Sequence, residues 1–311
     1  MTLKLAIGLT SFSLSLFAIF LNLLIFLPVF RLGFIAKKSS IYVIAFFNIL
    51  SDLMQLSVTC FYLSASIIAD RYLVTEERSG RLSIVFGWIF INAWYMECLV
   101  QIVMAVNRFT VITLKQKSIF TFNTTMLIFL VLVSTTAFSA VCTQYIFPCC
   151  VFIADEDVMS YMHINVEGMY SYSNLMLVSY DIFCTSTSTF CYISVFRSIR
   201  KSRSTVSSNV QRQRANQDVK YLLQFVFISI FYIFTWVLFE LLPHIVPADK
   251  PEWYSIVPVL VTLNCSSNSI IFLTINRDVQ KSLQIPSLRN KLNGAKSSSN
   301  AQVIQVVPIN N

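Results

Sequence analysis

Charged side chains are scarce in this 311-residue sequence. Asp, Glu, Lys and Arg together make up 12% of it, whereas hydrophobic residues make up 56%. Soluble globular domains contain roughly 25% charged residues. A soluble chain of this length could not keep so much apolar surface away from water. The composition therefore excludes an ordinary soluble domain and predicts a protein whose apolar surface faces lipid.

Histidine and glycine are also rare, with two and six residues respectively. His163 and His244 lie far apart in the sequence. The chain contains no HExxH helix, no CxxC pair, no phosphate-binding P-loop and no glycine-rich dinucleotide fingerprint, the motifs that supply a catalytic metal, phosphate or cofactor site. We therefore expect that the protein is not an enzyme and that it uses neither a cofactor nor a metal in catalysis.

Seven long apolar runs dominate what the sequence does contain. A helix needs roughly 20 predominantly apolar residues to cross the hydrocarbon core of a bilayer, and the runs lack the apolar–polar alternation of barrel strands. The predicted fold class is all-α, a seven-transmembrane helix bundle. The expected spans are about 5–30, 39–69, 83–106, 123–146, 168–196, 219–243 and 253–275.

The loop charges predict the orientation of the bundle. If the N-terminus is extracellular, 18 of the 23 basic residues fall on the cytoplasmic side, as the positive-inside rule requires. The formal net charge of +8 then reflects topology and an attraction to anionic membrane lipid, so we expect no nucleic-acid partner. The expected location is the plasma membrane, as a multi-pass protein.

Two polar segments lie on the predicted cytoplasmic side. Residues 197–218 form a basic, serine-containing stretch between the fifth and sixth spans, which is either a solvated linker or a contact surface for a cytoplasmic partner. The chain is expected to form one membrane domain with seven spans over residues 1–285. The tail, residues 286–311, is polar and is expected to be disordered.

Three acids lie within predicted spans, where ionisable groups are costly and usually functional. Asp52 and Glu97 are both near mid-bilayer. If they converge they cannot both ionise cheaply, so we expect that one is protonated or that a cation lies between them. The alternative is that Glu97 is simply protonated and hydrogen-bonded to a helix neighbour. Three amides at comparable depth complete this predicted polar core: Asn22, Asn264 and Asn268.

The third acid, Asp181, faces either a ligand cavity or a neighbouring helix. A cavity in a helix bundle lies between helices, and depth alone selects aromatic and acidic candidates for its wall. The alternative is that the aromatic residues are ordinary packing and interface anchors. Together with Asp181, the candidate pocket residues are Phe90, Trp94, Trp236 and Glu240.

The order of several marks along the chain resembles the skeleton of rhodopsin-type receptors. The marks are Asn22 in the first span, Asp52 in the second, Asn107-Arg108-Phe109 at the end of the third, and Asn268-Ser269-Ile270-Ile271-Phe272 in the seventh. Asn276-Arg277 and the residues that follow resemble the short amphipathic eighth helix of that family. No single mark is specific, but their order and spacing cover nearly the whole chain.

The departures from that skeleton are informative. Asn107 stands where an acid is usual, and Ser269 and Phe272 stand where proline and tyrosine are usual. Such erosion resembles the nematode serpentine chemoreceptors. The Asn-Arg-Phe triplet, the Pro148-Cys149-Cys150 segment with Asp155, and Gln224-Phe225 are most similar to serpentine receptor class x.

The resemblance implies a G-protein-coupled receptor for an environmental small molecule, with a heterotrimeric G protein as partner and the sensory cilium as a candidate location. It assigns G-protein coupling to Asn107, Arg108 and Phe109. Cys149 and Cys150 are candidates for a disulfide. Their partner stays open, because Ser83 stands where the familiar receptor bridge would place a cysteine.

Two other functions remain as alternatives. A membrane transporter or channel is one, although no internal repeat is evident and most prolines lie near span ends, unlike the broken helices of many transporters. A receptor that has lost coupling is the other, because several hallmark residues are altered.

Overall fold

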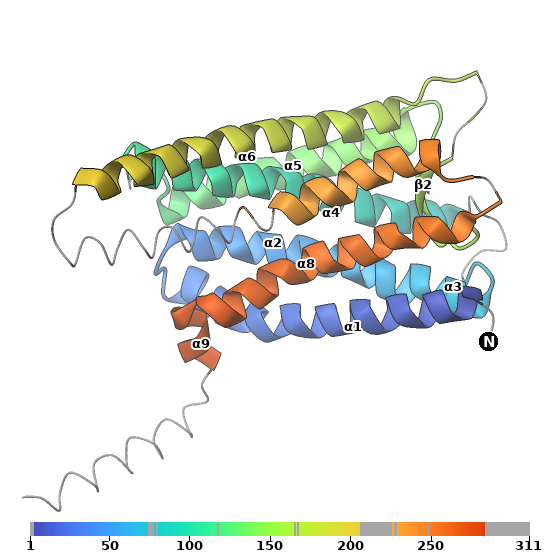
Figure 1. Cartoon of the computed structure of the whole chain (residues 1–311), viewed down its shortest axis with the longest axis horizontal. Helices are drawn as coiled ribbons and strands as arrows, with labels where there is room; N and C mark the ends of the chain where they lie inside the picture. The colour runs from blue at the N-terminus through green and yellow to red at the C-terminus, as the bar shows by residue number, and fades with distance from the viewer. Residues whose placement is uncertain are drawn as a thin grey trace, which may run out of the picture.

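A computed structural model describes residues 3–73, 78, 80–116, 118–164, 166, 168–205, 226, 229–247 and 249–283. Long helices run side by side through most of the molecule (Figure 1). The N-terminus and a small β-hairpin lie at one end of the bundle, here called the hairpin end, and a short helix turned away from the bundle marks the other, the α9 end.

Five continuous helical stretches are long and apolar enough to cross a membrane. Most of them contain one turn or more of π-helix at an end. The stretches comprise α1 (Leu3–Phe30) with η1 (Arg31–Ile35); α2 (Ser40–Val58) with η2 (Thr59–Ser64) and α3 (Ala65–Ala69); α4 (Arg81–Arg108) with η3 (Phe109–Thr113); α5 (Phe122–Val141) with η4 (Cys142–Ile146); and η5 (Pro251–Ser255) with α8 (Ile256–Ile275).

Two further helices complete the seven-helix bundle. One is α6 (Tyr172–Thr205), which is rich in serine and threonine and ends in basic residues. The other is an apolar helix, Ser229–Ile245, called the sixth-span helix below. The predicted all-α seven-helix fold is confirmed, and so is the short eighth helix, α9 (Arg277–Leu283).

The helix ends differ from the predicted spans. α4 and η3 extend to Thr113, beyond the predicted end near residue 106, because an apolar run marks the lipid-crossing part of a helix and not its continuation into water. α6 starts at Tyr172, not near 168. Most of 219–228 and the predicted tail, 286–311, lie outside the described residues.

Polar side chains inside the bundle bond to the helices that carry them. Ser39 caps α2 by accepting from the backbone N–H of Ile41, and Thr121 caps α5 in the same way. Within the spans, hydroxyls such as that of Thr59 donate to the carbonyl one turn earlier, here Gln55, at 2.8 Å. This bonding keeps polar atoms satisfied where no water is available.

A two-stranded hairpin, absent from the predicted architecture, packs into the bundle at the hairpin end. Strands β1 (Phe152–Asp155) and β2 (Ser160–His163) pair antiparallel, with Phe152 opposite His163. Gln144 at the end of the fourth span fixes β1: its amide donates to the Phe152 carbonyl at 2.7 Å, and its side-chain oxygen accepts from the Phe152 N–H at 2.8 Å. The hairpin is therefore part of the packed core.

At the α9 end, the short helix is tied to the start of α2. Asn276 caps α9 through the N–H groups of Asp278 and Val279. Asp278 pairs with Lys38 at 2.8 Å and accepts from the Tyr42 hydroxyl at 3.0 Å. The hydrogen bond from Lys38 is the main reason that the pKa of Asp278 is lowered.

Gly87 of α4 lies directly against β1 of the hairpin. A Cβ added there would lie 2.0 Å from the Phe152 carbonyl oxygen, so β1 would have to move. We predict that Gly87→Ala lowers stability by about 1–3 kcal/mol, despite the better helix propensity of alanine. The check is the thermal unfolding midpoint of the purified protein. Val85→Ala, on an exposed position of the same helix, is the control, and equal midpoints for the two variants would contradict the prediction.

Candidate functional site

A small cavity lies between the hairpin and the helices at the hairpin end. Its volume is about 20 Å³, enough for about one or two water molecules. The lining residues come from α4, the hairpin, α6, the sixth-span helix and α8: Phe90, Ile91, Trp94, Phe152, Tyr161, Leu177, Asp181, Thr235, Trp236, Phe239, Val257 and Val261.

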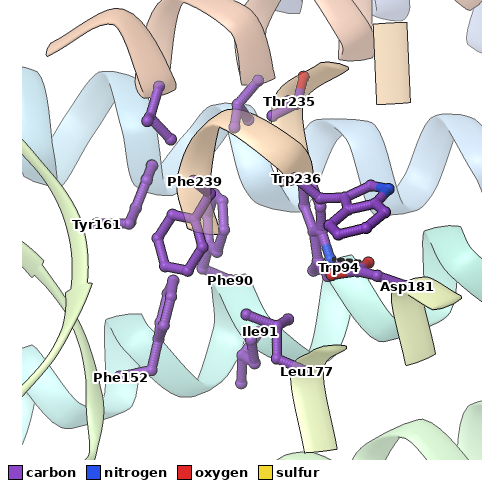
Figure 2. A pocket seen from close by; sticks show the side chains of 12 residues that line it. Phe90, Ile91, Trp94, Phe152, Tyr161, Leu177, Asp181, Thr235, Trp236 and Phe239 are labelled. Atoms are coloured by element: carbon purple, nitrogen blue, oxygen red, sulfur yellow. Dashed lines mark hydrogen bonds between the residues drawn. The ribbon is translucent and has the colours of Figure 1, made fainter. Parts of the chain in front are cut away.

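Four of the five predicted pocket residues meet at this cavity: Phe90, Trp94, Asp181 and Trp236 (Figure 2). Glu240, the fifth, is not among its lining residues. It is four residues beyond Trp236, one helical turn farther along the sixth-span helix. That a ligand binds here stays a prediction.

Aromatic residues supply half of the cavity lining. Phe90 stacks on Tyr161 with ring centroids 3.9 Å apart. The ring centroids of Phe90 and Phe152 are 5.6 Å apart. The hairpin residues Phe152 and Tyr161 were not predicted, because nothing in a loop sequence shows that it folds back into the bundle. Phe239 could have been found, since it follows Trp236 by three residues and so shares its helix face.

Asp181 is held at one side of the cavity by three donors from two other helices. The indole N–H of Trp94 donates to its Oδ1 at 3.1 Å, and the thiol of Cys98 lies 3.6 Å from the same oxygen. The hydroxyl of Tyr232 donates to Oδ1 as well. Asp181 thus links α4, α6 and the sixth-span helix.

A second group of buried polar residues lies deeper in the bundle, around Asp52 and Glu97. Glu97 accepts from the amides of Gln55 at 2.8 Å and Asn264 at 2.5 Å. Asp52 accepts from Asn48 at 2.9 Å and from Asn268 at 3.3 Å. The predicted convergence of the two acids with Asn264 and Asn268 is therefore present in the geometry.

The two carboxyl groups are close enough to share one occupant. Ligand atoms of Asp52, Glu97 and Cys265 all lie within 4.8 Å of one another. In the described part of the chain, Oδ1 of Asp52 and Oδ1 of Asn264 are buried without a hydrogen-bond partner. Such oxygen atoms suit a hard cation or a proton. Gln55 was missed, although it follows Asp52 by three residues on the same helix face.

Asn22 belongs to the same layer but contacts α8 directly. Its amide nitrogen donates to the Cys265 carbonyl at 3.1 Å, and its oxygen accepts from the Ser269 hydroxyl at 2.8 Å. Phe272, one turn below, is buried in an apolar cluster with Ile25. Serine at position 269 therefore forms a polar link between the first and seventh spans.

The predicted coupling residues lie at the α9 end of the third span. Asn107 is buried, and its carbonyl accepts from the Thr110 hydroxyl at 2.9 Å. Arg108 is the last residue of α4, and Phe109 begins η3. The structure places all three on one helical turn, and their role in coupling stays a prediction.

Cys149 and Cys150 are joined to each other in a disulfide between neighbouring residues. The sequence left their partner open. Cys150 adopts a left-handed backbone conformation, with φ of 70°, directly before the hairpin. The six other cysteines are free and buried.

Ion pairs attach the hairpin to the helix ends around it. Lys4 pairs with Glu156 at 2.8 Å and also with Asp70. The guanidinium of Arg78 donates to Asp155 at 2.6 Å. Burial raises the pKa of Glu156, although Lys4 opposes that effect.

The comparisons with known proteins agree with this architecture. The crystal structure of squid rhodopsin superposes with a TM-score of 0.66 at 12% sequence identity, covering 96% of this chain and 93% of that chain, which defines a rhodopsin-like seven-helix receptor fold. The sequence model of the family described as "Serpentine type 7TM GPCR chemoreceptor Srx" matches residues 12–277. The chain therefore belongs to the Srx serpentine chemoreceptor family. No curated protein matches the chain.

His163 gives the hairpin a pH dependence that can be measured. Burial lowers the pKa of His163 from 6.5 to about 4, although its bond to the Cys150 carbonyl acts in the opposite direction. Below pH 6.5 the unfolded chain binds a proton that the folded chain does not, so the stabilisation from neutral His163 is lost as the pH falls towards 4.

We predict that His163→Phe removes about 2 kcal/mol of the stability lost by the wild type between pH 7 and pH 5. The measurement is the thermal unfolding midpoint of both proteins across this range. The raised pKa of Glu156 acts in the opposite direction in both proteins, so the difference between them isolates His163. Parallel pH profiles would contradict the prediction.

Proposed function

We propose that this chain is a chemosensory G-protein-coupled receptor that binds an environmental small molecule in the cavity at the hairpin end and contacts a heterotrimeric G protein at the α9 end. The observation that carries the proposal is the cavity at the hairpin end, in which half of the lining residues are aromatic and one is an acid. Ligand sites in helix bundles have this form, apolar with a few polar groups that orient the ligand. Membership of the Srx family supports it.

Buried contacts supply a physical route from the cavity to the deeper polar core. Asp181 lies in the cavity wall and contacts Cys98 of α4. The residue before it on α4, Glu97, bonds to α2 through Gln55 and to α8 through Asn264. A ligand that changes the position of Asp181 would therefore act on helices that meet at the polar core, and binding would shift a conformational equilibrium of the bundle.

The polar core, with Asn22, Asp52, Glu97, Asn264 and Asn268, is proposed to hold a cation or a shared proton. The unpartnered oxygens of Asp52 and Asn264 support this, because buried polar atoms are normally satisfied. An occupant that relieves the repulsion between the two acids would stabilise the helix arrangement that brings them together.

We predict that sodium stabilises the receptor through this core. Replacing choline chloride by sodium chloride at constant ionic strength should raise stability by about 1 kcal/mol when sodium is about fivefold above its Kd. Glu97→Gln should remove the effect, whereas Glu252→Gln, outside the core, should retain it. The measurement is the thermal unfolding midpoint of purified protein. A sodium response shared by all three proteins would contradict a cation site, and a response to acidification alone would favour a shared proton.

The coupling end is proposed to be cytoplasmic, with the N-terminus extracellular. Basic residues concentrate in the segments at that end, as the positive-inside rule requires, and they also face anionic lipid headgroups. Arg108 carries a permanent charge that can bind backbone carbonyls or a carboxylate of the G protein. The plasma membrane, with the sensory cilium as a candidate, is the location that fits this function.

The receptor proposal is tested by second-messenger signalling in cells exposed to a panel of small molecules. Arg108→Ala should reduce the stimulated response about tenfold or more at matched surface expression, because it removes a central contact of the coupling surface. Arg31→Ala, which removes an exposed charge at the α9 end of the first span, should respond like the wild type. Ligand-driven current or uptake that persists in Arg108→Ala would favour a channel or transporter instead.

A further inference from the structure

The cavity wall contains one acid and no basic residue. Among its lining residues, Asp181 is the single ionisable acid and no lysine or arginine is present. The other lining side chains are apolar or aromatic, apart from the Thr235 hydroxyl, which already donates to the Phe231 carbonyl at 2.8 Å. An anionic ligand would therefore bring its charge next to a carboxyl group with no cation in the wall to balance it, which is unfavourable in a site removed from water.

The two ionisable groups described next, just outside the wall, add no positive charge near pH 7. Glu240 adds a second acid one turn beyond Trp236, and its Oε1 is buried without a hydrogen-bond partner in the described part of the chain. His163 packs edge-on against the rings of Phe152 and Phe239. It is neutral near pH 7, because burial lowers its pKa to about 4.

Two cations near the hairpin are already paired with acids. Lys4 pairs with Asp70 and Glu156, and Arg78 pairs with Asp155. These groups hold the hairpin in place and are not lining residues of the cavity. The wall therefore presents one carboxyl group to a ligand and no basic side chain.

Asp181 has an oxygen to offer to such a ligand. All three of its described donors, Trp94, Cys98 and Tyr232, go to Oδ1, and no described hydrogen bond goes to Oδ2. The indole N–H of Trp236 is also buried without a described partner. Figure 2 shows Asp181 and Trp94 close to the Trp236 ring, with the other aromatic side chains around the remaining space.

Aromatic faces around a carboxylate are the chemistry that recognises an ammonium group. A cation within about 6 Å of an aromatic ring centre is attracted by the ring quadrupole, most strongly by tryptophan, and the attraction grows when water is excluded. Six of the lining residues are aromatic, two of them tryptophans. The volume of about 20 Å³ limits the occupant to a small molecule, and even that requires some side chains to move.

We propose that this cavity binds a small amine in its protonated form, with the ammonium group on Oδ2 of Asp181 and the hydrocarbon part against the aromatic walls. The proposal rests on the cavity being the ligand site of the proposed receptor. It names the charge and the size of the ligand, and it excludes small carboxylic acids.

The test measures binding directly, on the purified full-length protein in lipid nanodiscs, by ligand-dependent shifts of the thermal unfolding midpoint. The probes are two series in which one carbon skeleton carries three headgroups. One series is phenethylamine, phenethyl alcohol and phenylacetate, and the other is isoamylamine, isoamyl alcohol and isovalerate. An amine of at least one series should stabilise the wild type, the matching alcohol should do so less, and the matching acid should have no effect.

Asp181→Asn keeps the size of the side chain and removes its charge, so it should bind the amine about tenfold to hundredfold more weakly. Glu252→Gln removes an acid outside the cavity and should bind the amine like the wild type. The size-exclusion profile and the ligand-free midpoint show whether each variant folds. The ranking of the three headgroups on the wild type tests the proposal even if Asp181→Asn does not fold.

The proposal is overturned if alcohols or acids bind as well as amines, if neither amine binds, or if Asp181→Asn binds the amine as tightly as the wild type. Binding in nanodiscs requires no G protein, so the two proposals can fail separately. Amines that bind without activating a G protein in cells would count against the receptor function and leave the amine site intact. Signalling driven only by alcohols or acids would support the receptor function and contradict the amine site.

Discussion

Glu97 accepts hydrogen bonds from Gln55 of α2 and Asn264 of α8, and the arrangement of the bundle depends on this buried carboxyl group. In lipid, apolar packing gives helices little reason to choose one neighbour over another, because lipid tails are as apolar as leucine. A polar group in mid-membrane does discriminate, since it is costly unless a partner meets it. Glu97 fixes the rotation and depth of α4 relative to two other helices, and Asp52 and Asn22 fix the first, second and seventh spans around it.

α4 contributes residues to both the polar core and the cavity. Cys98 faces Asp181, and the preceding residue, Glu97, faces the core. Successive residues of an α-helix point about 100° apart, so two neighbours address different sides of the bundle. A small rotation of α4 must therefore disturb both groups of hydrogen bonds together. The proposed ligand site and the residues that hold the helices in register therefore move together.

The sequence predicted what lipid and helical periodicity determine. The seven spans follow from runs of apolar residues, and the meeting of Asp52, Glu97, Asn264 and Asn268 follows from their common depth. What it did not predict depends on how chain segments fold back. The hairpin that carries Phe152 and Tyr161 lies in a segment without helical periodicity, and its place in the core is set by Gln144 and Gly87, residues that form no recognisable motif.

The ends of the helices were also not predicted by the apolar runs. The predicted third span ends near residue 106, whereas the helix that carries it continues through η3 to Thr113. The sequence also did not show that Cys149 and Cys150 bond to each other. The resemblance offered no partner for either residue, because Ser83 stands where the familiar bridge needs a cysteine. In each case the missing information is a contact between positions, which depth and periodicity along one chain do not contain.

The clamp of Gln144 on Phe152, together with the ion pairs of Lys4 and Arg78, has a kinetic consequence. The hairpin forms one wall of the cavity, so a molecule that enters from that side must wait for anchored backbone to move, and one that has entered must wait again to leave. An anchored wall of this kind would lower the association rate of the proposed ligand and lengthen its residence. Such a detector would average its surroundings over time and would be poorly suited to following rapid fluctuations in concentration.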